Sequence, residues 1–429
     1  MLINNLQSNH RTQCVVPVAL VASHLISLFS RSRAHARQSD NPLLHSTGSV
    51  NMGSVFSLMA TYGKSTACFT FALALTVYNR YQSSKYRRAV HEREAEGRDN
   101  ETPKTKDFFP LQLDIGAPKR TLIQGGPDTP LLAFTDSLGL EIATYHWPAT
   151  NGNKDGPVVM LCHGLDVNAE SEFCIRPGHH WEGSWQKHLC DAGFNVYGWD
   201  HHGMGRSESV MASDHRTVCY NFDDYVDVAV QCRKIVGSRH PNSKIFMHGQ
   251  SLGGCVAIRT AERHPTLFDG LSLACPAVYL EKVKQKPINK ILLPLVDVLR
   301  VIVPWLRVGA KEPHPRKDVV AEAHKIGPPM FNGESPTPAS FAGALLVAAD
   351  RSIADTLKLK DLPIHFMHAI EDPFVDYKGS EIMYNLLKQE GAKDVTLYNT
   401  FDDPMHDIVQ TKDSQKCAGV LVKWLVDRI

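Results

Sequence analysis

The sequence lacks an excess of charge of either sign. Its 46 lysine and arginine residues face 45 aspartate and glutamate residues, which leaves a net charge of +1 over 429 residues. A protein that binds nucleic acid or another polyanion carries a clearly basic face, and usually a basic composition. The balance therefore argues against a nucleic-acid partner and against a polyanionic substrate.

The cysteines lack the spacing of a zinc site or a redox motif. The chain has ten of them, and no two form a C-x-x-C pair. Several, such as Cys162, Cys255 and Cys275, lie inside apolar stretches. This distribution predicts reduced, buried thiols in a cytosol-like compartment rather than a framework of disulfides.

Motifs for metals and cofactors are also missing. The histidine pairs at 179–180 and 201–202 have no carboxylate or cysteine pattern beside them, and adjacent residues of an extended segment point apart. We interpret both pairs as polar loop residues. The glycines of residues 203–205 lack the rest of a phosphate-binding fingerprint. The sequence therefore predicts neither a metal nor a cofactor.

No apolar run near the N-terminus has the full length of a transmembrane helix. Residues 55–78 are apolar, but Lys64 interrupts them and leaves 14 continuous residues, whereas spanning a bilayer takes about 20. Five basic residues follow between positions 80 and 93. We expect residues 53–80 to anchor the chain in a membrane, with the following domain on the cytosolic side. An amphipathic helix that packs on the domain or lies on the bilayer surface is the alternative.

The segments around this run lack the periodicity of a folded core. Residues 1–52 are rich in arginine and serine and contain one acidic residue, Asp40, a composition typical of a mitochondrial or plastid targeting peptide. A disordered extension, or translation that starts at Met52, would also account for them. Residues 81–110 form a charged linker, and we expect the folded domain to occupy residues 111–429.

Within this domain, short apolar stretches alternate with helical ones. Helical patterns occur, for example, at residues 223–238 and 378–389. Such alternation predicts an α/β fold with a mostly parallel, doubly wound sheet. Eight stretches have the length and composition of strands: residues 131–135, 140–147, 158–162, 194–200, 245–247, 271–275, 364–369 and 395–398.

The turn after residues 245–247 has the pattern of a nucleophile elbow. The sequence Gly249-Gln250-Ser251-Leu252-Gly253 matches G-x-S-x-G and stands between a strand and a small-residue helix start. The glycines keep the turn tight and leave the serine in a strained conformation at its tip. Its hydroxyl is thereby exposed beside a helix N-terminus, where backbone N–H groups face negative charge. An idle serine in a glycine-rich turn is the alternative.

A nucleophilic serine needs a histidine as base, and the histidine needs a carboxylate to fix its tautomer. In hydrolases with this elbow the chain order is serine, acid, histidine, each after a strand. Asp372 follows the seventh predicted strand, with Glu371 and Asp376 as alternative acids, and His406 follows the eighth. We therefore assign Ser251, Asp372 and His406 as the catalytic residues.

The oxyanion that forms during serine attack needs backbone donors. The N–H of Leu252, at the helix start, supplies one of them. We expect the second from the loop His163-Gly164-Leu165, which follows the strand 158–162, and we assign it to the N–H of Leu165. His163 itself is interpreted as structural rather than as a second base.

One long segment, residues 277–360, interrupts the alternation without an obvious sheet strand. Within it, residues 288–308 are apolar at helical spacing, and we expect Pro294 and Pro304 to kink the helix. We predict a helical cap over the active site, inserted before the acid-bearing strand. An ordinary core helix would show the same apolar stripe.

Five blocks resemble the monoacylglycerol lipase and lysophospholipase-like branch of the α/β hydrolases. They occur in family order between residues 134 and 429, and the second block is particular to this branch. The resemblance implies an α/β-hydrolase fold, the same catalytic residues and oxyanion donors, and no cofactor. The blocks are HGLD at 163–166, WDHHGMGRSE at 199–208, HGQSLGG at 248–254, HAIED at 368–372 and PMHD at 404–407.

The resemblance further implies a serine esterase that cleaves carboxylic esters of membrane-derived lipids, such as monoacylglycerol or lysophospholipid, under an apolar cap that approaches the membrane. Two features depart from the family pattern: Gln250 replaces a histidine that many members carry, and the loop at 170–183 is longer than usual. An acyltransferase or thioesterase could use the same residues. A non-catalytic ligand-binding protein of this fold is the alternative from another class.

Overall fold

The computed structural model describes residues 105–174, 180–211, 216–308, 316–327, 329–331 and 336–429. The expected targeting extension, membrane anchor and most of the charged linker lie outside these ranges, so all three stay predictions. Among the described residues, no helix combines the length and the apolar character that crossing a bilayer would require.

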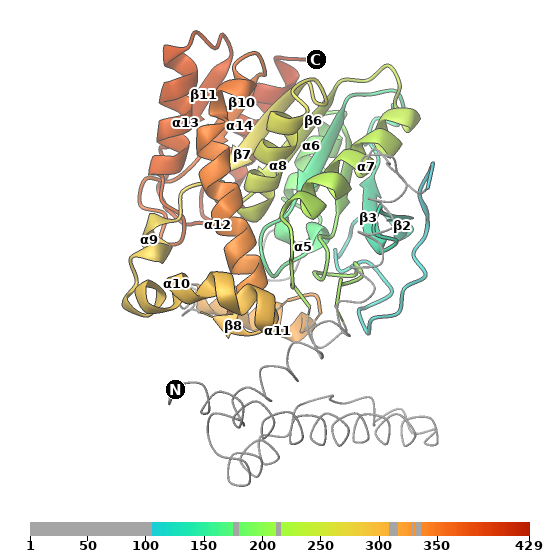
Figure 1. Ribbon diagram of the computed structural model, residues 1–429. Coiled ribbons are helices and arrows are strands. Elements are labelled where there is room, and N and C mark those ends of the chain that lie inside the picture. Colours follow the sequence, from blue (N-terminus) through green and yellow to red (C-terminus); the bar gives the residue numbers. More distant parts are fainter. Residues whose placement is uncertain (1–104, 175–179, 212–215, 309–315, 328, 332–335) are drawn as a thin grey trace, which may run out of the picture. The chain divides into compact units, whose positions relative to one another are not determined.

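The described chain forms one large sheet with the strand order β1-β2-β3-β5-β4-β6-β7-β10-β11 (Figure 1). Pairing is antiparallel from β1 to β5 and parallel from β5 to β11. This confirms the mostly parallel α/β sheet. The strands are β1 (Phe109–Pro110), β2 (Leu132–Thr135), β3 (Glu141–Trp147), β4 (Val158–Cys162), β5 (Asn195–Trp199), β6 (Ile245–Gln250), β7 (Gly270–Ala274), β10 (Ile364–Met367) and β11 (Val395–Tyr398).

Two hydrophobic cores, one on each face of the sheet, explain why the central strands are apolar throughout. Successive side chains of a strand point to opposite faces. Val158, Met160 and Cys162 of β4 accordingly belong to one buried cluster, while Val159 and Leu161 belong to the other. A strand buried on both faces has no polar side, which is the usual pattern of a parallel sheet.

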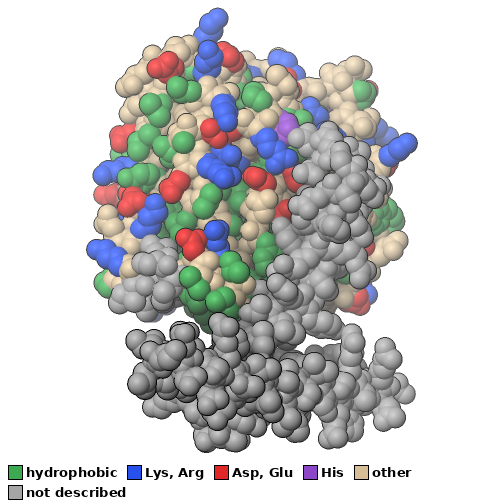
Figure 2. All heavy atoms as spheres, viewed as in Figure 1, with side chains coloured by type: hydrophobic (Ala, Val, Ile, Leu, Met, Phe, Trp, Pro, Cys, Tyr) green, Lys and Arg blue, Asp and Glu red, His purple; other side chains and the backbone are tan. Residues whose placement is uncertain are grey.

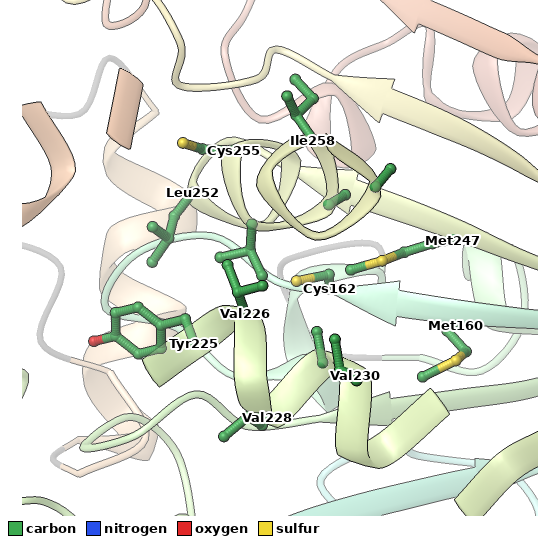
Figure 3. Close-up of a cluster of buried hydrophobic side chains, with 14 of the residues drawn as sticks. Met160, Cys162, Tyr225, Val226, Val228, Val230, Met247, Leu252, Cys255 and Ile258 are labelled. Atoms are coloured by element: carbon green, nitrogen blue, oxygen red, sulfur yellow. The ribbon is translucent and has the colours of Figure 1, made fainter. Parts of the chain in front are cut away.

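Helices cover both faces. The larger core contains side chains of α7 (Asp223–Arg239), α8 (Leu252–Arg263), α12 (Ala339–Ala354) and α13 (Lys378–Gln389). The other contains side chains of α5 (Ala169–Glu172), α6 (Trp185–Asp191) and α14 (Ser414–Val426). Figure 3 shows side chains of α7 and α8 meeting those of β4 and β6. The helix that follows Ser251 is thus fixed by a buried interface.

The chain between β7 and β10 adds no strand to the large sheet. It forms α9 (Glu281–Lys284), α10 (Pro287–Ile302), α11 (Lys317–Ile326), α12 and the 3₁₀ helix η3 (Thr356–Leu359), together with the small antiparallel pair β8 (Arg307–Val308) and β9 (Thr337–Pro338). The sequence did not indicate this pair. The helix α10 continues through Pro294 and ends two residues before Pro304. The prediction that Pro304 kinks this helix is therefore wrong, because Pro304 lies beyond its end.

The described surface agrees with the balanced composition. On the face shown in Figure 2, basic and acidic side chains are interspersed and form no field of one sign. The eight cysteines in the described part of the chain are all free and buried, so their predicted burial is confirmed.

Candidate active site

The strand-to-helix turn at Ser251 has the strained geometry expected of a nucleophile elbow. Ser251 lies between β6 and α8 with φ 54° and ψ −113°, a backbone region that costs a non-glycine residue energy. A Cβ atom at Gly249 would lie 2.4 Å from the carbonyl oxygen of Gly253, and one at Gly253 would lie 2.0 Å from that of Cys162. Both positions therefore require glycine.

The three residues assigned as catalytic lie together. His406 Nε2 is 2.8 Å from Ser251 Oγ, and His406 Nδ1 is 2.7 Å from Asp372 Oδ2. Asp372 follows β10, and His406 lies between β11 and the 3₁₀ helix η4 (Ile408–Gln410). Of the alternative acids, Glu371 is exposed and Asp376 accepts a hydrogen bond from the N–H of Lys378. A histidine bonded to a serine on one side and a carboxylate on the other can transfer a proton from that serine.

The carboxylate of Asp372 is held in place from several sides. It is fully buried, and its Oδ1 accepts hydrogen bonds from the N–H groups of Phe374 and Val375 at 2.8 and 2.9 Å. On the other side, His368 Nε2 lies 3.3 Å from Oδ2. The sequence did not indicate that this second imidazole, at the end of β10, faces the acid. Its position four residues before Asp372 in the HAIED block is the only signal of it.

Burial and charge pull the pKa values of this pair in opposite directions. Burial alone would raise the pKa of Asp372, but the positive charge of His406 and the contact with His368 outweigh it and hold that pKa below the usual range. Burial alone would lower the pKa of His406, but the Asp372 carboxylate outweighs it and raises that pKa to about 9. The acid is therefore ionised at neutral pH, and it stabilises a protonated histidine.

The two predicted oxyanion donors flank the nucleophile. A Cβ atom at Gly164 would lie 3.6 Å from Ser251 Cβ, so the backbone just before Leu165 packs against the serine. Leu252 is the first residue of α8. Within the described ranges, neither Leu165 nor Leu252 donates its backbone N–H to a protein acceptor. Among these residues, no backbone acceptor competes with a substrate oxygen for either N–H group.

His163 holds the loop that carries Leu165. Its Nδ1 donates to the carbonyl of Gly164 at 2.7 Å, and its Nε2 accepts from the N–H of His201 at 3.0 Å. Burial lowers the pKa of His163 to about 3. Because both nitrogens are bonded to the backbone and the ring stays neutral, His163 has a structural role rather than that of a second base.

The WDHHGMGRSE block forms a buried polar network beneath the same loop. The Asp200 carboxylate accepts from the N–H groups of Ala169 and Arg206 and from the hydroxyl of Tyr145, at 2.7 to 2.9 Å. Arg206 also forms a buried ion pair with Glu170 at 2.9 Å. The block therefore fixes α5, which directly follows the predicted oxyanion loop. Sequence reasoning used these residues as a signature and missed this role.

The histidine pair at 201–202 lies in the turn after β5, as expected of loop residues, but both side chains are buried. His202 Nε2 lies 2.6 Å from Asp136 Oδ2, and both side chains are buried. Burial by itself would lower the pKa of His202, but Asp136 outweighs it and raises that pKa. The ion pair between His202 and Asp136 therefore ties the turn after β5 to the turn after β2.

One group of potential metal ligands occurs among the described residues, and it coincides with the triad. The sulfur of Cys275, an oxygen of Asp372 and a nitrogen of His406 lie within 4.8 Å of one another. Burial, reinforced by the charge of Asp372, raises the pKa of the Cys275 thiol well above its usual value. Since a metal would need the thiolate and a free imidazole nitrogen, the group fits a hydrogen-bonded triad better than a metal centre.

Known proteins resemble this chain in sequence. Residues 173–413 match the Hydrolase_4 family, described as serine aminopeptidase, S33. The monoacylglycerol lipase of Mycolicibacterium smegmatis is 23% identical over 274 residues, which cover 63% of this chain and 89% of that protein. The human monoglyceride lipase is 26% identical over 200 residues, or 46% of this chain, and the match spans 61% of the human protein's length.

Solved structures resemble it in fold. A monoacylglycerol lipase from Paleococcus ferrophilus superposes with a TM-score of 0.53 at 21% identity, covering 68% of this chain and 99% of that one. A soluble variant of monoglyceride lipase from Saccharomyces cerevisiae, in complex with a substrate analog, gives a TM-score of 0.53 at 18% identity, covering 75% and 100%. These structures share the α/β-hydrolase fold with the described chain.

Proposed function

This chain belongs to the Hydrolase_4 family and is a serine ester hydrolase similar to monoacylglycerol lipases; we propose that its substrates are carboxylic esters of membrane-derived lipids, such as monoacylglycerol or lysophospholipid. The observation that carries the proposal is the position of His406, 2.8 Å from Ser251 Oγ and 2.7 Å from Asp372 Oδ2. A serine hydroxyl needs such a pair of partners in order to attack an ester.

The proposed reaction has two halves. Ser251 Oγ attacks the ester carbonyl carbon while His406 Nε2 takes the hydroxyl proton, and the carbonyl oxygen becomes an oxyanion. The N–H groups of Leu165 and Leu252 donate to it; losing one such donor typically costs about 2.7 to 4 kcal/mol of barrier. His406 then gives its proton to the departing alcohol, which leaves an acyl-enzyme. Water, deprotonated by His406, attacks the acyl carbon and releases the acid and the free serine.

Asp372 contributes by fixing the imidazole. Its carboxylate accepts a hydrogen bond from the Nδ1–H of His406, so the Nε2 nitrogen faces the serine with a lone pair. When the imidazole becomes positively charged, the ionised carboxylate stabilises it at short range.

A lipid substrate is supported by the relatives' names and by the surface of α10. The curated relatives are monoacylglycerol and monoglyceride lipases. In the described chain, Val298 and Val301 of α10 are 53% and 65% exposed, and Leu306 just beyond that helix is 43% exposed. Exposed apolar side chains on and just beyond one helix favour contact with a lipid aggregate.

The test is the Ser251→Ala variant, assayed with a fluorophosphonate probe and with a panel of monoacylglycerols, lysophospholipids and aminoacyl amides. We expect loss of probe labelling and a fall in ester turnover on the order of 10⁴ to 10⁶-fold. Ser352→Ala is a matched control, because Ser352 is a buried serine whose hydroxyl bonds to Ala348 O within α12. The Ser352→Ala variant should react with the probe and hydrolyse the esters at the wild-type rates.

Other outcomes identify other functions. A wild-type protein that resists the probe would contradict the hydrolase proposal and favour a ligand-binding role. Labelling without lipid turnover, but with release of amines from aminoacyl amides, would replace the lipid substrate by a peptide one. Transfer of the acyl group to an added alcohol, in preference to water, would indicate an acyltransferase.

A further inference from the structure

The side chain of Gln250 connects the nucleophile to the base. Gln250 precedes Ser251 at the end of β6 and is completely buried. Its Nε2 donates a hydrogen bond of 2.9 Å to the backbone carbonyl of His406, which lies 156 positions further along the chain. One side chain, adjacent to the serine, therefore holds the backbone of the histidine.

The chemistry of the contact fixes the orientation of the amide. A backbone carbonyl only accepts hydrogen bonds, so the NH₂ group and not the oxygen of Gln250 must face His406. The amide oxygen is buried and has no hydrogen-bond partner among the described residues. An unpaired buried oxygen destabilises a fold, and an apolar side chain of the same length would avoid that penalty. Stability alone therefore does not explain a glutamine here.

The loop that carries His406 is bonded near that residue mainly to itself; the N–H of Ile408, for example, also donates to the His406 carbonyl at 3.1 Å. It joins β11 to α14 through residues 399–413, and the side chains at 402–405 are exposed or half-buried. The end of the loop is bonded to its beginning, because the Asp413 carboxylate accepts hydrogen bonds from the N–H groups of Asp402 and Asp403. At His406 itself the tie to the sheet is the Gln250 amide, and β6 is paired on both sides by β4 and β7.

We propose that Gln250 is a positioning residue, which keeps His406 Nε2 at hydrogen-bond distance from Ser251 Oγ by holding the His406 backbone against the nucleophile strand. The inference rests on the proposed function, since it assigns Gln250 to the geometry of that same reaction. A shift of about 1 Å between reacting groups can lower a rate about 100-fold. The effect of Gln250 should therefore fall on the rate of proton transfer and not on substrate binding.

The first test compares Gln250→Met, which keeps the length of the side chain and removes the donor, with Gln410→Met. Gln410 is a matched control because it is a buried glutamine on the same loop, and its side-chain oxygen also has no partner in the described chain. We expect Gln250→Met to lower kcat about 10- to 100-fold with KM unchanged, and to slow labelling by a fluorophosphonate equally. Gln410→Met should leave both rates within about twofold.

Two more variants separate positioning from folding. Gln250→His restores an N–H donor at similar reach and should recover most of the labelling rate. Gln250→Glu preserves the shape but places an acceptor against the His406 carbonyl, so its labelling rate should fall at least as far as that of Gln250→Met. If Gln250→Met does not fold, the comparison is made between the wild type and the isosteric variant Gln250→Glu, provided that their unfolding temperatures match.

Failure of this inference is distinguishable from failure of the proposed function. If the wild type reacts with the probe, and Gln250→Met or Gln250→Glu reacts equally fast, the serine hydrolase remains and Gln250 has no positioning role. An increase in KM at constant kcat would also overturn the inference, because it would place Gln250 in substrate binding. A wild type that does not react would refute the proposed function itself.

Discussion

The acid and the base of the proposed triad are held in different ways. The Asp372 carboxylate accepts from two N–H groups of its own loop, those of Phe374 and Val375, and its carbonyl accepts from Lys282 Nζ at 2.7 Å. The local frame of His406 is smaller: among the described residues, its carbonyl accepts from the N–H of Ile408 at 3.1 Å. Its ring bonds Ser251 and Asp372, and its carbonyl bonds Gln250, all three distant in sequence.

This difference shows which part of the site is preorganised by local structure. A loop that wraps its own carboxylate keeps that carboxylate in place whatever the rest of the site does. A histidine whose ring is bonded only to distant residues depends on the relative placement of two strands and a loop. We therefore expect the acid to tolerate loss of a peripheral contact, and the base to be sensitive to one.

Removing the carboxylate itself should have the largest effect. In Asp372→Asn the amide can still accept from the backbone at Oδ1, but its NH₂ group faces His406 Nδ1 and favours the wrong imidazole tautomer. We expect kcat to fall by about 10⁴ with little loss of folding, measured by ester turnover and by thermal unfolding. Asp376→Asn is the matched control in the same loop, because the Asp376 carboxylate accepts from the N–H of Lys378 and forms no hydrogen bond or ion pair with His406 among the described residues. Equal losses in the two variants would contradict the assignment of the acid.

A pH series should show the acid acting on the base. His406 must be neutral to accept a proton, and Asp372 raises its pKa to about 9. We expect kcat/KM to rise about tenfold for each pH unit below that value and to level off above it. Because the folded pKa lies above the ordinary value of 6.5, the stability that the pair contributes is complete below pH 6.5 and is lost as the pH rises through about 9.

Two measurements check this prediction. Rates of probe labelling between pH 6 and 10 give the activity limb, and unfolding temperatures over the same range give the opposite trend in stability. A labelling rate that is already constant above pH 7 would contradict a raised pKa in the free enzyme.

A peripheral contact of the acid should matter least. Lys282→Met removes the ammonium group of α9 that donates to the Asp372 carbonyl, but the carboxylate keeps its bonds to Phe374 and Val375. A single partly exposed hydrogen bond contributes about 0.5 to 1.5 kcal/mol, so kcat should fall less than about tenfold. Lys284→Met is the control on the same helix, since Lys284 pairs with Glu281 at 2.9 Å. If kcat fell further in Lys282→Met than in Gln250→Met, the acid and not the base would be the more sensitive to loss of a peripheral contact.

Much of the fold follows from the sequence where periodicity is strong. The predictions of a strand at 158–162 and 395–398 and of a helix at 378–389 are confirmed to the residue. The strand at 245–247 was predicted too short, because β6 continues through His248, Gly249 and Gln250, whose pairing with β4 and β7 does not require apolar side chains. The two-residue strands β1, β8 and β9 carry no periodicity at all, so no sequence pattern could indicate them.

The sequence by itself determined the fold class, the elbow and the identity of the three candidate catalytic residues, because glycine spacing and the order of residues after strands are local properties of the chain. Tertiary structure alone decided what surrounds them: His368 against the acid, Gln250 behind the base, and the Asp200 network under the oxyanion loop. The contacts of Gln250 and Asp200 join residues 156 and 31 positions apart, and a side chain carries no local mark of the distant partner it will meet. Even His368, four positions before Asp372, faces it only because of the turn that the chain makes after β10.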